Sequence, residues 1–93
     1  MNGKRWRVEL EPDVQREFDR ITAEEERGAE AIDGFLRFVH RSPEEGYAFF
    51  RDDPDTRSRP FHTATNAYVV LYAFDAERVT CLGIKPIPYT APG

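Results

Sequence analysis

The sequence has few of the residues that form disulfides and metal centres. Its 93 residues include one cysteine, Cys81, and two histidines. A lone cysteine cannot form an intramolecular disulfide, and with so few histidines we expect neither a metal site nor a cofactor. A single cysteine inside an apolar run also suits a reducing compartment. We therefore expect a cytoplasmic protein in which Cys81 is a small buried core residue.

Long apolar runs and an excess of basic residues are absent as well. No stretch approaches the roughly 20 apolar residues that span a bilayer, so we expect no membrane contact. The basic residues near the N-terminus have no apolar run behind them, which argues against a signal peptide. The 13 Lys and Arg residues stand against 17 Asp and Glu residues, giving a formal net charge of −4. This balance argues against non-specific nucleic-acid binding through a generally basic surface.

Apolar and aromatic residues are plentiful, at 40% and 13% of the chain, and predict one small globular domain over residues 1–93. The most apolar stretch, residues 68–84, contains two runs of β-branched and aromatic residues. A short polar break at 75–77 separates them, which predicts an antiparallel hairpin. Neither face of this hairpin is polar, so we expect a central pair of strands covered on both sides.

Residues 6–41 predict a strand followed by a helical hairpin. Residues 6–10 alternate large apolar with charged residues, as in a half-buried strand. A first helix opens near Pro12 and carries an apolar stripe of Val14, Phe18 and Ile21. A second helix runs to about residue 41. It begins either at Thr22, where Thr22 and Glu25 have the spacing of a capping box, or nearer Ala29.

Two segments then lead into the apolar hairpin. Residues 47–50, Tyr-Ala-Phe-Phe, fit either a short strand or a loop, and we expect most of their aromatic side chains to complete the core. Residues 57–63 predict a strand, and the prolines after Lys85 should end the last strand. The resulting order β-α-α-β-β-β is an α+β layout, with the helical hairpin packed on a small, mostly antiparallel sheet.

This layout and one motif resemble the RelE/ParE superfamily of small toxins from type II toxin–antitoxin systems. The motif reads Ala-Tyr-Val-Val-Leu-Tyr-Ala-Phe-Asp over residues 67–75. It is similar to the family's turn, Tyr-Arg, apolar residues, Tyr and acidic turn. Gly83-Ile84-Lys85 and Tyr89 stand where relatives carry a basic residue and a terminal tyrosine. The resemblance implies a RelE/ParE-like fold and an antitoxin protein as the partner.

For function, the resemblance implies two alternatives. The nuclease members are metal-independent endoribonucleases that cut messenger RNA on the ribosome, where basic residues and a tyrosine place the 2′-hydroxyl for attack on the next phosphate. The residues here that could serve are His62, Lys85 and Tyr89 as catalytic groups, with Arg57 and Arg59 as RNA phosphate contacts. The other alternative is a non-enzymatic protein-binding module on the same fold, either a gyrase inhibitor or a non-toxic relative that only binds its partner.

The sequence departs from the nuclease pattern at two places. Val69 stands where an arginine commonly follows the hairpin tyrosine, and Pro-Ile-Pro replaces a basic stretch after Lys85. Loss of a pre-positioned cation typically slows such chemistry by roughly a hundredfold. Each candidate also has a structural interpretation. His62, Lys85 and Tyr89 fit ordinary strand-end residues, and Arg57 and Arg59 could pair with nearby Asp52, Asp53 and Asp55.

Overall fold

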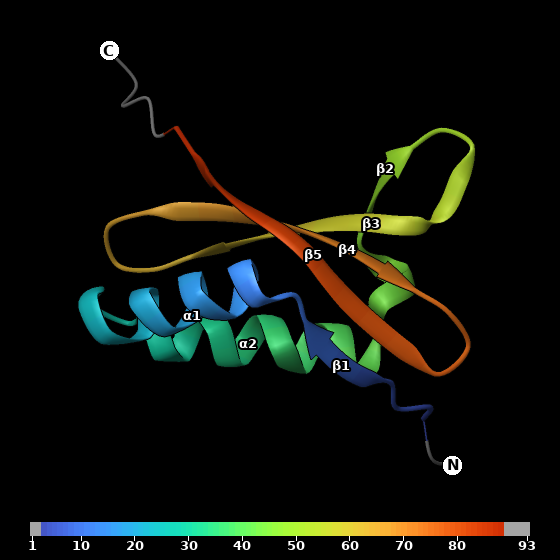
Figure 1. Cartoon of the computed structure of the whole chain (residues 1–93), viewed down its shortest axis with the longest axis horizontal. Coiled ribbons are helices and arrows are strands. Elements are labelled where there is room, and N and C mark those ends of the chain that lie inside the picture. Colours follow the sequence, from blue (N-terminus) through green and yellow to red (C-terminus); the bar gives the residue numbers. More distant parts are fainter. Residues whose placement is uncertain (1–2, 89–93) are drawn as a thin grey trace.

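A computed structural model of the protein describes residues 3–88 and contains a five-stranded sheet with two helices on one side (Figure 1). The elements are β1 (Arg7–Leu10), α1 (Pro12–Glu24), α2 (Gly28–Arg41), a 3-10 turn (Pro43–Glu45), β2 (Tyr47–Phe50), β3 (Asp53–His62), β4 (Ala67–Phe74) and β5 (Arg78–Ile87). The strand order is β1-β5-β4-β3-β2, with β1 parallel to β5 and the other pairs antiparallel. The predicted α+β class is confirmed, and residues 47–50 are a strand.

The helices pack on the sheet through the two predicted apolar stripes. Buried side chains on the helices are Val14, Phe18, Ile21, Ile32, Phe35 and Val39. They meet Phe61, Tyr68, Val70, Tyr72, Val79 and Cys81 from the strands. Phe35 lies in the middle of this core, with its ring centroid 6.0 Å from those of Phe18 and Phe61 and 6.4 Å from that of Tyr72. Neither helix is long and apolar enough to cross a membrane.

Gly28 fixes the junction between the two helices. A Cβ at this position would lie 2.2 Å from the carbonyl oxygen of Ile21, so only glycine permits the close approach. Arg27 before it adopts a left-handed conformation with φ of 63°. Helix α2 therefore begins at the later of the two predicted starts. The capping box at Thr22 does not form, because α1 continues through Thr22 to Glu24.

The prediction that the central hairpin is covered on both sides is wrong for the described residues. Both helices lie on the same side of the sheet (Figure 1). Tyr68, Val70 and Tyr72 of β4 are buried beneath them, whereas the alternate residues Val69, Leu71 and Ala73 are only half-buried. We call the helix side the covered face and the opposite side the open face. The sequence showed that both faces are apolar, but α1 and α2 cover only one of them.

Two further predictions about strand ends and core residues are also wrong. Strand β5 continues through Pro86 to Ile87. Strand β1 pairs only with residues 78–81 of β5, so at Pro86 strand β5 has no outer neighbour among the described residues. Proline is tolerated at such an edge position because its missing N–H breaks no hydrogen bond of the sheet. The aromatic side chains of Tyr47, Phe49 and Phe50 do not complete the core, because each is more than half exposed.

Candidate functional site

The open face carries an apolar hollow of about 250 Å³. Its walls include Phe49 from β2, Val69 and Leu71 from β4, and Lys85 from β5. Gly83 lies opposite Leu71 in the ladder and adds no side chain above it, which leaves the leucine uncovered. Lys85 is the one charged residue of the lining. The hollow therefore suits an apolar group that carries a negative charge at one end.

A β-bulge in β5 shapes the same face. Tyr72 of β4 lies opposite Cys81, while the preceding Leu71 lies opposite Gly83, so Leu82 is an extra residue between the two pairs. Leu82 is 42% exposed. A bulge of this kind bends a strand and redirects its side chains. Here it adds exposed apolar surface close to the hollow.

Two of the sequence-predicted catalytic residues lie on the open face. Lys85 pairs with Val69, and His62 pairs with Ala67 at the far end of β3. Phe61 is buried on the covered face, so strand alternation directs the exposed His62 to the open face. The ladder places His62 two strands and two residues away from Lys85, about 12 Å between Cα atoms at standard sheet spacings. Tyr89, the third predicted catalytic residue, lies outside the described residues.

Arg57 and Arg59 lie on the covered face, away from His62 and Lys85. Arg57 pairs with Tyr72 in the ladder and donates hydrogen bonds to the carbonyl oxygens of Pro54 (2.7 Å) and Gly46 (3.2 Å). The guanidinium of Arg59 stacks 3.9 Å from the ring centroid of Phe38 on α2. Neither arginine forms an ion pair with a carboxylate within residues 3–88, so the expected pairing with Asp52, Asp53 and Asp55 is wrong.

A polar cluster that the sequence analysis missed joins the helical hairpin to the β3–β4 turn. The Glu25 carboxylate accepts hydrogen bonds from the Tyr68 hydroxyl, from Thr63 Oγ1 at 2.8 Å and from Asn66 Nδ2 at 3.0 Å. Arg20 Nη2 lies 3.5 Å from the same carboxylate and donates to the Tyr68 oxygen at 3.2 Å. Partial burial opposes ionisation of Glu25, but these donors and the Arg20 charge outweigh it and lower the pKa of Glu25.

This cluster is a structural clamp. No buried side-chain nitrogen or oxygen of the described residues, in this cluster or elsewhere, lacks a hydrogen-bond partner. Desolvation, followed by the hydrogen bond to Glu25, raises the pKa of Tyr68, so its phenol stays protonated. In the sequence, Glu25 was noticeable only because it lies three positions after Thr22. Its hydrogen-bond donors on the β3–β4 side lie 38 to 43 positions later in the chain, so the sequence did not indicate the cluster.

The chemistry available on the open face is limited. Phosphoryl transfer without a metal needs a base, a cation and an acid around one phosphate. Of the four predicted residues within 3–88, only His62 and Lys85 lie on the open face, and no hydrogen bond joins them. Within residues 3–88 no group of three His, Cys, Asp or Glu side chains could hold a metal ion. Comparisons with models of protein families, with curated proteins and with solved structures find no match to this chain.

Proposed function

We propose that this protein is the toxin-like component of a toxin–antitoxin pair and that it acts by binding another protein, without catalysis. The observation that supports this function best is the apolar open face. Phe49, Val69 and Leu71 surround its hollow, and Tyr47 and Phe50 add further exposed aromatic surface on β2. Exposed apolar patches of this kind mark interaction sites on small proteins.

The partner that fits is a protein segment with an apolar side and one carboxylate. The apolar side would fill the hollow over Leu71, and the carboxylate would pair with Lys85, the single charge in the lining. Besides messenger RNA on the ribosome, the family resemblance implies two protein partners, an antitoxin and gyrase. Neither requires the residues of a nuclease site.

The endoribonuclease remains the second candidate, because His62 and Lys85 share the open face. Such an enzyme would place messenger RNA across β3, β4 and β5, with Tyr89 completing the site. The positions of Arg57 and Arg59 weaken this proposal. Their side chains are held on the covered face by Gly46, Pro54 and Phe38, so they could not reach a phosphate bound beside Lys85.

Expression of the chain in bacterial cells tests the two candidates. We expect growth arrest with intact messenger RNA, relieved by Leu71→Thr on the open face and unaffected by His62→Ala. The nuclease candidate predicts the reverse: cleaved messenger RNA, arrest relieved by His62→Ala and by Lys85→Ala, and little effect of Leu71→Thr. Circular dichroism of each purified variant controls for folding. Normal growth during expression of the unaltered protein would contradict the toxin proposal itself.

A further inference from the structure

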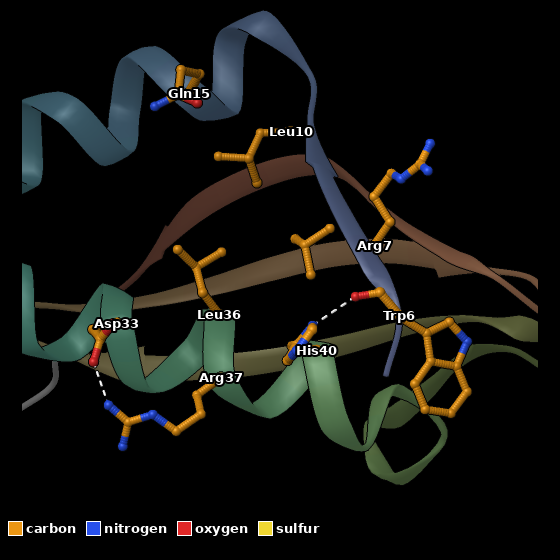
Figure 2. A pocket seen from close by; sticks show the side chains of 9 residues that line it. Trp6, Arg7, Leu10, Gln15, Asp33, Leu36, Arg37 and His40 are labelled. Atoms are coloured by element: carbon orange, nitrogen blue, oxygen red, sulfur yellow. Dashed lines mark hydrogen bonds and ion pairs between the residues drawn. The ribbon is translucent and has the colours of Figure 1, made fainter. Parts of the chain in front are cut away.

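The edge of the sheet formed by β1 borders a groove of about 560 Å³ that lies apart from the open face. Figure 2 shows β1 along one side of this groove and α2 along the other. Leu10 of β1 and Leu36 of α2 point into the space, and Val8 also belongs to the lining. Gln15, Asp33, Arg37 and His40 supply its polar border.

The backbone of β1 has hydrogen-bonding groups directed toward this groove. Arg7 N–H donates to the Glu77 carbonyl and Glu11 N–H to the Cys81 carbonyl, both at the β5 side. In a strand, successive residues direct their N–H and C=O groups to opposite edges. Val8 and Leu10, which lie between Arg7 and Glu11, therefore direct their N–H groups away from β5, as does the Val8 carbonyl.

His40 limits the length of this free edge. Trp6 N–H donates to the His40 carbonyl at 2.9 Å, and His40 Nδ1 lies 2.7 Å from the Trp6 carbonyl, as the dashed line in Figure 2 marks. Both edge groups of Trp6 are thus bonded to α2. Beyond Leu10 the chain turns into α1. The accessible part of the edge is short, at Val8 and Leu10, and it lies directly over the apolar floor of the groove.

We infer that this edge binds an extended peptide segment of a partner protein, which adds a short strand beside β1. Strand addition supplies affinity through main-chain hydrogen bonds and specificity through pockets for alternate side chains. The residue opposite Val8 would point its side chain to the same side as Val8, toward Leu36. That position takes an apolar residue of moderate size.

The charge around β1 specifies the other side chains of the segment. Residues 4–7 contain Lys4, Arg5 and Arg7 and no acid, although the chain as a whole carries a net charge of −4. Glu9 is paired with Arg78 at 3.6 Å, whereas Arg7 has no ion-pair partner among residues 3–88. Residues of the added strand that flank the apolar position point to the open-face side, beside Arg7. The segment therefore alternates apolar with acidic residues.

A second copy of the chain fits this edge less well. Two β1 strands paired about a two-fold axis through Val8 would form hydrogen bonds only between the two valines, because Trp6 is already bonded to His40 in each copy. A separate peptide can also bond to the Leu10 N–H. It can place its side chains in the groove without bringing two α2 helices together.

The test is a titration with a synthetic peptide of seven residues, acetylated and amidated, in which valine alternates with aspartate. Trp6, the only tryptophan of the chain, lines the groove and reports binding through its fluorescence. We expect saturable binding, slower hydrogen exchange at the Val8 and Leu10 amides, and weaker binding at high salt. A matched peptide with lysine in place of aspartate should bind at least about tenfold more weakly.

Two variants separate strand addition from non-specific attraction. Val8→Pro removes one outward N–H and should weaken binding about fivefold to tenfold, since an edge strand tolerates proline. Arg7→Glu, at an exposed position, should lower the preference for the acidic over the basic peptide by about threefold or more. Retained binding in both variants would overturn the proposal. A second result would also overturn it: slow hydrogen exchange at the Val8 amide in the absence of peptide that becomes slower as the protein concentration rises. That result would mean that a second copy of the chain occupies the edge.

Discussion

Strand β4 contributes to two faces of the same sheet, and the two faces differ in burial. On the covered face Tyr68, Val70 and Tyr72 are at most 5% exposed, while on the open face Val69, Leu71 and Ala73 are half-buried. Both sets consist of apolar or aromatic residues. The difference comes from the helices, which pack on one face only (Figure 1). The free energy of unfolding should therefore depend mainly on the side chains of the covered face, and the open face is available to bind a partner protein.

The largest expected effect comes from the centre of the covered face. Phe35→Ala removes a ring that contacts Phe18, Phe61 and Tyr72, and it should lower the free energy of unfolding by about 3–5 kcal/mol. The matched control is Phe49→Ala, which truncates a ring that is 53% exposed and should cost less than about 1 kcal/mol. Urea denaturation followed by circular dichroism measures both. Equal losses would show that the open face is as important for folding as the core.

A second prediction concerns Tyr72, which is fully buried and donates a hydrogen bond of 2.6 Å to the Pro43 carbonyl. Tyr72→Phe removes this hydrogen bond and leaves the carbonyl with only the longer one from Gly46 N–H, at 3.3 Å, so it should cost about 1–2 kcal/mol at neutral pH. Burial raises the pKa of Tyr72 from 10.0 to about 12, against the opposing charges of Arg57 and Arg59. The unfolded chain therefore loses this proton first, and stability falls as the pH rises from about 10 through 12.

Cys81 adds to this alkaline loss, because burial raises the pKa of its thiol from 9.0 to about 12. Denaturant unfolding at pH 8 and pH 11 measures the combined decrease. The Tyr72→Phe variant should show a shallower decrease than the unaltered protein, since only the Cys81 thiol and the Tyr68 phenol, whose pKa values are also raised, then contribute. An identical slope in the two proteins would mean that Tyr72 is accessible to hydroxide in the folded state.

The third prediction concerns the Glu25 clamp at the end of the covered face. Glu25→Gln keeps the shape but removes the charge that accepts from Tyr68, Thr63 and Asn66, and it should cost about 1–2 kcal/mol at pH 7. Because the pKa of Glu25 is lowered on folding, its contribution is present above pH 4.5 and is lost as the pH falls below that value. Thermal melts at pH 7 and pH 3 should show a smaller acid-induced loss in the variant. Glu24→Gln, at an exposed neighbouring position, is the control and should resemble the unaltered protein.

The sequence was sufficient to predict the two helices and every strand except β2, because their signals are local. The stripes of α1 and α2 follow helical spacing, and β4 and β5 follow from composition and a polar break. The parallel pairing of β1 with β5, the open face and the clamp at Glu25 could not be predicted. Each depends on contacts between residues far apart in the chain, such as Glu25 with Tyr68 at a separation of 43 positions. Side-chain alternation puts Arg57 and Arg59 on one face, but the sequence did not indicate that helix α2 occupies it.

The smallest expected effect is also the sharpest comparison, since it uses one substitution at two adjacent positions. Val69 and Val70 differ in the face they occupy: Val70 is fully buried, and Val69 borders the hollow on the open face. Val70→Thr places a hydroxyl in the core and should cost about 1–3 kcal/mol. Val69→Thr exposes the same hydroxyl to water and should change the free energy of unfolding by less than about 0.5 kcal/mol.

Measuring the free energy of unfolding of both variants at several protein concentrations separates the possible results. A large cost at Val69 that grows with concentration would mean that copies of the chain cover the open face, and a large cost independent of concentration would mean that the chain itself covers it. Only a small cost at Val69 leaves that face free for a partner protein.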